Sequence, residues 1–278
     1  MPELPEVERG RLVAHEVAHG RVIAKVQCAP DEIVLDGVGP RDFAAALTGR
    51  TVHAVRRWGK QLWFELDEAP HPLFHFGMTG GFRIRDTAPL QLKSGPTEVP
   101  HEWPPRFAKV HLWFDDGGEL VFADGRRLGR VLLRRDPRGE PPLSRLGPDP
   151  VHNMPTPAAF RSMMQSRSSV IKSLLLDQSV LAGLGNWMAD EVLYQSKIDP
   201  RRRACDLSDV ETERLRKKIL LVVRRAVAAN ADDGQYPKTW LFHQRWGRKA
   251  DATTASGAPI HHITLGGRTT AWVPSVQS

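Results

Sequence analysis

The chain has 278 residues, 39 lysines and arginines against 32 acidic residues, and only two cysteines, Cys28 and Cys205. A hydrophobic fraction of 41% excludes wholesale disorder, and two cysteines exclude a disulfide framework or a four-cysteine metal site. No apolar run approaches the roughly 20 residues of a membrane span, and the acidic N-terminus lacks a signal-peptide core. We therefore expect a soluble intracellular protein of about two domains, whose charge of +7 indicates a polyanionic partner.

The first half of the sequence has the pattern of one α-helix followed by short β-strands. The helix is predicted from Glu6 to about Ala18. Alternating apolar residues, typical of half-buried strands, occupy the segments 21–28, 61–66, 72–78, 109–114 and 119–124. The last two flank Asp115–Gly118, a strong hairpin-turn signal. This half is expected to form an antiparallel β-sandwich.

Two of these alternations assign particular residues to a face. In the first strand, Ala24 is placed on the same face as Val22 and Val26. In the third strand, Met78 continues the alternation of Phe74 and Phe76, so core packing is one interpretation of this methionine.

The second half of the sequence has helical periodicity. The segment from Asp136 to Pro157 contains seven prolines and is predicted to be a linker. Helical patterns follow at 156–165, 171–183, 186–198 and 207–230, and the last opens with a capping box, Ser208 and Glu211. From about Lys249 the composition favours a hairpin instead.

These patterns predict an α+β fold. We expect an N-terminal helix plus an antiparallel β-sandwich domain over residues 1–135 and a linker over 136–155. A helical domain is expected over 156–248, and a terminal hairpin over 249–278.

The N-terminus has the chemistry of a nucleophile. Initiator methionine is removed readily before small residues, which would leave Pro2 as a secondary amine at the chain terminus. An α-amino group has a pKa of about 7.7–8.0, so much of it is neutral near pH 7, and it can form a Schiff base with a sugar carbon. Glu3 and Glu6, three residues apart, share one helix face and could supply acid catalysis. From the residues alone, an ordinary helix N-terminus explains the same pattern.

The run MPELPEVE resembles the N-terminal signature of the formamidopyrimidine-DNA glycosylase family of base-excision repair enzymes. The resemblance implies that Pro2 is the nucleophile, Glu3 the catalytic acid and Glu6 the second carboxylate of the motif. The Gly-Lys pair before the strand at 61–66 resembles the family motif in which an essential lysine binds phosphate, and Lys60 takes that role by resemblance. A solvated lysine at a strand edge is the plainer interpretation.

The segment around Gly183-Leu184-Gly185 has the pattern of helix, tight turn and helix. Asn186 stands at the expected N-cap, where free backbone N–H groups could hold a phosphate. An ordinary helical hairpin is the alternative. The stretch is similar to the family's helix-two-turn-helix, which implies a DNA-binding role for Asn186 and, more weakly, for Lys172.

A glycosylase must fill the space of a flipped nucleotide. The resemblance assigns this void-filling role to Met78, in Gly77–Gly80, and to Arg126 and Leu128, in the run Asp124-Gly125-Arg126-Arg127-Leu128-Gly129. Leu128 replaces the aromatic wedge of the family, and an aliphatic side chain fills space without stacking as a ring does.

The C-terminal hairpin departs from the four-cysteine zinc finger common in the family. The four cysteine positions fall on Thr253, Ser256, Val273 and Val276, so no metal ligand is expected there. This resembles the zincless finger of the plant and fungal branch. Arg268 keeps the position of the finger arginine, a phosphate clamp.

The resemblance implies a bifunctional DNA glycosylase and AP lyase that acts through a Pro2 Schiff base with β,δ-elimination. Family members that excise 8-oxoguanine cover the flipped base with a long loop before the finger, and the corresponding segment here is short. The resemblance to the plant and fungal branch therefore implies strong activity on formamidopyrimidines and hydantoins and weak activity on 8-oxoguanine. Two alternatives stay open: a catalytically silent DNA-binding protein on the same scaffold, and a hydrolytic glycosylase with paired carboxylates. We expect no cofactor, damaged double-stranded DNA as the partner, no membrane association, a monomer, and a nuclear location if the source is eukaryotic.

Overall fold

The computed structural model describes residues 2–85, 87, 93 and 102–278, and the chain divides into two compact units, Met1–Arg145 and Leu146–Ser278. The division falls inside the predicted proline-rich linker, directly after a short 3-10 turn, Leu143–Arg145. No helix in the described part of the chain is long and apolar enough to cross a membrane.

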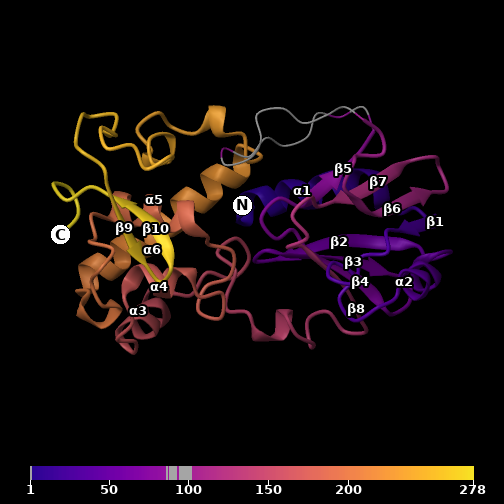
Figure 1. Ribbon diagram of the computed structural model, residues 1–278. Coiled ribbons are helices and arrows are strands. Elements are labelled where there is room, and N and C mark those ends of the chain that lie inside the picture. The colour runs from indigo at the N-terminus through magenta and orange to yellow at the C-terminus, as the bar shows by residue number, and fades with distance from the viewer. Residues whose placement is uncertain (1, 86, 88–92, 94–101) are drawn as a thin grey trace. The chain divides into compact units, whose positions relative to one another are not determined.

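The first unit consists of two antiparallel four-stranded sheets, flanked by α1 (Leu4–Ala18) and α2 (Pro40–Leu47) (Figure 1). One sheet has the order β1-β6-β7-β5 and the other the order β2-β3-β4-β8. The strands are β1 (Ile23–Cys28), β2 (Val52–Trp58), β3 (Gln61–Leu66), β4 (His71–His75), β5 (Gly81–Arg83), β6 (Ala108–Phe114), β7 (Glu119–Ala123) and β8 (Arg130–Arg134). The α+β class and the β-sandwich are therefore confirmed.

Aromatic side chains fill the core of this unit. Phe74, Phe82 and Phe122 meet with ring centroids 5.0 to 6.0 Å apart, and all three are buried. Helix α1 packs against β2 and β5, so the beginning of the chain lies on this core. Edge-to-face aromatic packing of this kind favours one rigid arrangement of the two sheets.

The sequence assigns Ala24 and Met78 to buried strand faces, and the structure places both elsewhere. A bulge between Ile23 and Lys25 shifts the register of β1, so Ile23 is buried while Ala24 is exposed. Strand β4 ends at His75, so Met78 lies in the following turn and is only half-buried.

The second unit is helical. Its helices are α3 (Pro157–Gln165), α4 (Ile171–Leu176), α5 (Asn186–Ser196) and α6 (Asp209–Ala228). The predicted capping box of Ser208 and Glu211 is present at the start of α6. Helix α4 is shorter than predicted because the carboxylate of Asp177 accepts the N–H of Ser179 at 2.9 Å, a local bond that competes with the helix.

The chain ends in the predicted hairpin, β9 (His261–Leu265) and β10 (Arg268–Trp272). Its two-residue turn uses Gly266 and Gly267 at φ values of +53° and +71°, the left-handed conformation that a type I′ turn requires. The hairpin segment contributes to an apolar cluster of Leu241, Ile260, Ala271 and Val273. Tyr194 of α5 and Val276 pack against this cluster.

Candidate functional site

The start of α1 brings the two predicted carboxylates together. Glu3 is the N-cap residue of the helix and is 1% exposed, and Glu6 is 8% exposed. The N–H of Glu3 donates to Oε2 of Glu6 at 2.8 Å. This bond fixes the direction of the chain immediately after Pro2, which is itself buried. Met1, whose removal the sequence predicts, lies outside the described residues.

Pro2 and Glu6 line a small pocket within the first unit. Its other lining residues are Gly10, Phe76, Thr79, Gly80, Gly81, Phe82 and Arg83. Burial raises the pKa of Glu6 to about 7, and the negative charge of Glu3 adds to the effect. Burial, with a smaller contribution from the charge of Arg9, lowers the pKa of the Arg83 guanidinium. The pocket therefore joins the predicted nucleophile to a carboxyl group that holds a proton near neutral pH.

Lys60 lies in the tight turn between β2 and β3, and a buried arginine connects this turn to α1. Nε of Arg57 donates to Glu8 of α1 at 2.7 Å, and its Nη1 donates to the carbonyl of Gly59 at 2.9 Å. Gly59 has a φ of +57°, which the turn requires. The turn that carries Lys60 is thus anchored to the helix that begins beside Pro2.

His75 is a neighbour of Lys60 that sequence analysis missed. It is the register partner of Gln61, the residue after Lys60. Burial, followed by the positive charges of Lys60 and Arg130, lowers the pKa of His75 to about 4, so its imidazole is neutral. Its Nδ1 accepts the N–H of Gly77 at 3.2 Å. The bond ties the end of β4 to the turn of Met78.

The two predicted void-filling loops share one buried carboxylate, Asp124, which is 1% exposed. From the first loop, Oγ1 of Thr79 donates to Oδ1 of Asp124 at 2.9 Å. From the second loop, the N–H groups of Arg126 and Gly129 donate to Asp124 at 3.1 and 2.6 Å. Asp124 therefore fixes the Met78 turn and the Arg126–Leu128 loop relative to each other.

The side chain of Leu128 lies at the surface, 42% exposed, and Arg126 is exposed as well. The neighbouring Arg127 instead binds Asp31, at 3.0 and 3.1 Å. A Cβ on Gly77 would lie 2.4 Å from the backbone carbon of Leu128, so only glycine allows the two loops this close an approach.

In the second unit, Asn186 is not the N-cap as predicted. Gly185 takes that position, and Asn186 is the first residue of α5. Its side chain turns to the hairpin instead, where Nδ2 donates to the carbonyl of Thr269 at 2.8 Å. Only Gly183 of the two turn glycines has a positive φ, +104°.

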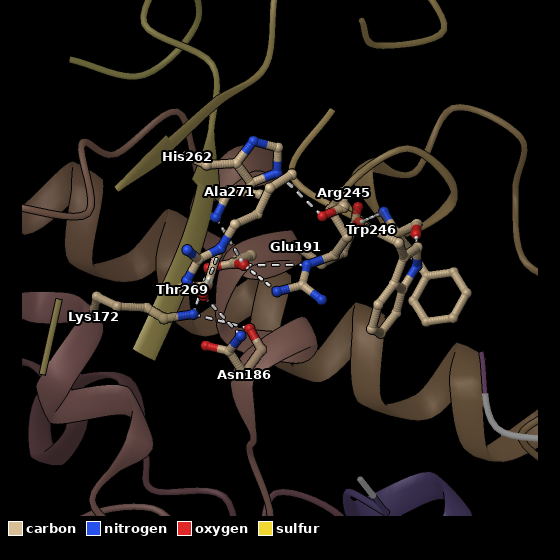
Figure 2. Close-up of polar contacts among 11 residues, drawn as sticks. Lys172, Asn186, Glu191, Arg245, Trp246, His262, Thr269 and Ala271 are labelled. Carbon is tan, nitrogen blue, oxygen red and sulfur yellow. Dashed lines mark hydrogen bonds and ion pairs between the residues drawn. The ribbon is translucent and has the colours of Figure 1, made fainter. Parts of the chain in front are cut away.

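Lys172 is fully buried inside this unit. Its ammonium donates to the carbonyl of Asn186 at 2.9 Å and to the carboxylate of Asp190 (Figure 2). These two partners lie within the protein. A direct contact of Lys172 with DNA therefore stays a prediction.

Arg268 begins β10 and is exposed directly after the glycine turn. Of the four positions where a zinc finger has cysteines, Thr253 and Ser256 are exposed and Val273 is fully buried. Across the described residues, no group of three or more His, Cys, Asp or Glu side chains could hold a metal ion.

The chain has a β-sandwich unit whose first helix begins at a buried Pro–Glu pair and a helical unit with a Gly-x-Gly-Asn turn, an architecture that it shares with DNA glycosylases of known structure. The family model for the formamidopyrimidine-DNA glycosylase N-terminal domain matches residues 1–131, and the model for the H2TH domain of the same enzymes matches residues 146–236. The chain belongs to the formamidopyrimidine-DNA glycosylase family.

Individual relatives agree with this assignment. A formamidopyrimidine-DNA glycosylase of Arabidopsis thaliana is 42% identical over 277 residues, which cover 100% of this chain and 71% of the relative. The enzyme of Paracoccus denitrificans is 32% identical over the full length of both chains. Among solved structures, the Lactococcus lactis enzyme bound to DNA with an AP site has a TM-score of 0.79 at 27% identity and covers 99% of each chain.

The residues that support the candidate site and that sequence analysis missed are Asp124, His75 and Asp190. Asp124 had a usable signal, since it opens the DGRRLG run and acidic side chains often accept N–H groups two residues on. Asp190 follows Asn186 by four residues and so shares its helix face. Nothing in the local sequence distinguishes His75.

The raised pKa of Glu6 predicts how the stability of the protein depends on pH. The folded protein keeps a proton on Glu6 up to a pKa of about 7, against 4.5 for the ordinary group, so folding is favoured at low pH. This contribution is lost as the pH rises from about 4.5 through 7. Relative to Glu6→Gln, the wild-type free energy of unfolding should fall by about 3 kcal/mol over this window. Urea denaturation at pH 5 and pH 8 measures it.

Glu16→Gln, an exposed position on the same helix, is the control and should leave the pH dependence of stability unchanged. Parallel stability–pH curves for wild type and Glu6→Gln would contradict the raised pKa.

Replacing Asp124 by Asn should lower the free energy of unfolding by about 1–3 kcal/mol, because one amide oxygen cannot serve three donors. Urea denaturation measures the loss, and amide hydrogen exchange at Gly129 should become faster. Asp116→Asn is the matched control, since Asp116 accepts the N–H of Gly118 at 3.0 Å in an exposed turn. If both variants lose the same free energy of unfolding, Asp124 has no greater structural role than an exposed turn residue.

Proposed function

We propose that the protein is a bifunctional DNA glycosylase and AP lyase of base-excision repair, which removes oxidised bases through a Schiff base on Pro2. The observation that carries the proposal is the pocket that joins Pro2 to Glu6, at a helix start where Glu3 and Glu6 are hydrogen-bonded. The Glu3–Glu6 capping box alone fits an ordinary helix N-terminus; what goes beyond that role is that Glu6, buried beside Pro2, lines the pocket and has a raised pKa.

In the proposed reaction, removal of Met1 frees the Pro2 nitrogen, which attacks C1′ of the damaged nucleotide. The bond from C1′ to the base breaks, and the base leaves with the proton that the Pro2 nitrogen gives up. Glu3 protonates the ring oxygen as the bond from C1′ to that oxygen opens, which leaves an iminium ion between Pro2 and C1′. The resulting iminium ion acidifies the neighbouring carbon, so the 3′ and then the 5′ phosphate depart by β- and δ-elimination. Water then hydrolyses the Schiff base and restores the amine. Glu6, with its pKa of about 7, donates or accepts a proton at neutral pH. This chemistry uses no metal and no organic cofactor.

Three side chains are assigned to the phosphates of double-stranded DNA: Lys60, Asn186 and Arg268. Support for Lys60 comes from its position in a turn that Arg57 anchors to α1. Support for Arg268 comes from its exposure at the tip of the hairpin. Charged side chains on tight turns can approach a backbone phosphate with little loss of conformational freedom.

Met78, Arg126 and Leu128 are proposed to occupy the space of the flipped nucleotide. The shared hydrogen bonds to Asp124 support this, because they hold the two loops as one element. The exposed Leu128 would enter the duplex as an apolar wedge, and Arg126 would face the orphaned base.

The proposed substrates are formamidopyrimidines and hydantoins, with weak activity on 8-oxoguanine. The segment between α6 and the hairpin supports this preference, because Tyr236, Trp240 and Phe242 are each at most 4% exposed and pack against Trp187. A segment held by four aromatic rings lacks the freedom to fold over a flipped base. We also infer a zincless hairpin of the plant and fungal type, in which buried Val273 replaces a metal ligand.

Borohydride reduction on abasic-site DNA tests the nucleophile. Protein whose Met1 removal is verified by mass spectrometry should form a covalent adduct on its N-terminal peptide, because borohydride reduces the iminium ion to a stable amine. The matched control carries an uncleaved N-terminal extension, which converts the Pro2 nitrogen into an amide, and should form none. No adduct with the processed protein would favour the silent DNA-binding protein, and base release without strand cleavage would favour the hydrolytic enzyme.

Single-turnover rates test the substrate preference. On matched oligonucleotide duplexes, excision of a formamidopyrimidine should be at least about tenfold faster than excision of 8-oxoguanine, a difference of about 1.4 kcal/mol in activation free energy. Cleavage of an abasic site in the same duplex is the control for intact lyase chemistry. Comparable rates on the two lesions would overturn the preference.

A further inference from the structure

A single buried carboxylate, Asp190 of α5, connects the helices of the second unit to the hairpin. It is 1% exposed. Its Oδ1 accepts the ammonium of Lys172, and its Oδ2 accepts Nε of Arg245 at 3.1 Å. The same Oδ2 accepts the backbone N–H of Ala271 in β10, also at 3.1 Å. Two cations and one strand amide thus converge on one side chain.

A second connection runs parallel to the first. Asn186 donates to the carbonyl of Thr269 in β10, and Lys172 donates to the carbonyl of Asn186 (Figure 2). Arg248 donates to Oγ1 of Thr269 as well. Lys172 therefore binds both Asn186 and Asp190, and each of these α5 residues is hydrogen-bonded to β10.

The two contact residues on α5 are spaced like the two contact residues on β10. Asn186 and Asp190 are four residues apart on α5, which is about 6 Å along a helix. Thr269 and Ala271 are two residues apart on β10, which is about 6.6 Å along a strand. Alternate residues of a strand direct their backbone groups to the same edge. Helix α5 thus supplies one acceptor and one donor to the edge of β10, where a two-stranded hairpin has no further strand.

We propose that Asp190, held by Lys172 and Arg245, is the anchor that fixes the hairpin without a metal ion, and that it is thereby a positioning residue for Arg268. Arg268 lies one residue before Thr269 and three before Ala271 in the same strand. With both of these backbone groups fixed, the glycine turn and Arg268 can move little relative to α5. The second half of the proposal rests on the contact of Arg268 with DNA proposed above.

The charges explain why the anchor is a carboxylate. Lys172 is fully buried and Arg245 is 7% exposed, so each cation needs a negative partner inside the protein. An amide in place of Asp190 would remove the negative charge that the two cations share and would offer Ala271 a weaker acceptor. The hairpin should then detach locally, while the packing of α6 stays intact.

The test is a double-mutant cycle on binding to a duplex with a tetrahydrofuran abasic analogue, which needs no chemistry. Arg268→Ala should raise the Kd about tenfold and reduce the slope of log K against log salt by about one. Asp190→Asn should raise the Kd about three- to tenfold. The double variant should bind within about twofold of Arg268→Ala alone, because an arginine that is absent cannot be mispositioned.

Glu191→Gln is the matched control. Glu191 is the adjacent buried carboxyl on α5, but its described hydrogen bonds go to Gln195 and the N–H of Phe242, not to the hairpin. This variant should bind DNA within about twofold of wild type. Circular dichroism and thermal melting establish that each variant folds. If Asp190→Asn does not fold, Arg245→Gln takes its place and is judged by the same criteria.

Hydrogen exchange separates the anchor from the DNA contact. The Ala271 amide should exchange faster in Asp190→Asn and at the wild-type rate in Arg268→Ala. Wild-type exchange at Ala271 in Asp190→Asn, or losses of affinity that multiply in the double variant, would overturn the proposal. If Arg268→Ala leaves the Kd and the salt slope unchanged, the proposed contact with DNA is wrong, and exchange at Ala271 alone then decides whether Asp190 holds the hairpin.

Discussion

A carboxyl group that leaves water must be given hydrogen-bond donors or must keep its proton, and this constraint fixes the start of α1, the two loops around Asp124 and the C-terminal hairpin. Glu6 accepts a backbone N–H at the start of α1 and keeps a proton up to a pKa of about 7. Asp124 accepts the N–H of Gly129, and Asp190 accepts the N–H of Ala271. Each donor belongs to a neighbouring stretch of backbone, so burying the carboxyl group fixes that stretch in place.

This arrangement suits turns, helix starts and strand edges, where backbone N–H groups have no partner in a helix or sheet. Turns contain backbone N–H groups that no ladder satisfies, and a loop that must hold one conformation needs partners for them. An apolar side chain at the position of Asp124 could fill the space, but it would leave three donors unpaired. The side chain of Leu128 can therefore point outward while its backbone stays fixed. A rigid loop can in this way present an exposed side chain.

The sequence predicts whatever is local and misses whatever depends on distant partners. Helix α6 follows from its helical periodicity and its capping box, and the β6–β7 hairpin follows from Asp115–Gly118, because these signals lie within a few residues. The face of Ala24 was wrong because a bulge depends on the partner strand. Asn186 was found by the motif, but its partner Thr269 lies 83 residues further along the chain, where no periodicity reaches. The resemblance supplied Pro2 and Glu3, and the fold explains how the chain holds them.

The internal ion pairs also change the meaning of the net charge. Several arginines bind carboxylates within their own unit: Arg57 binds Glu8, Arg127 binds Asp31, and Arg245 binds Asp190. Each of these cations pairs with a carboxylate that is buried or half-buried, so its charge is largely compensated within its own unit. The net charge of +7 therefore does not show which cations are available to a partner. The attraction for a polyanion depends on where the exposed cations lie. The phosphate contact proposed for Arg268 depends on the two backbone contacts that hold its strand, because a fixed cation loses less conformational entropy on binding than a mobile cluster, which must first be ordered.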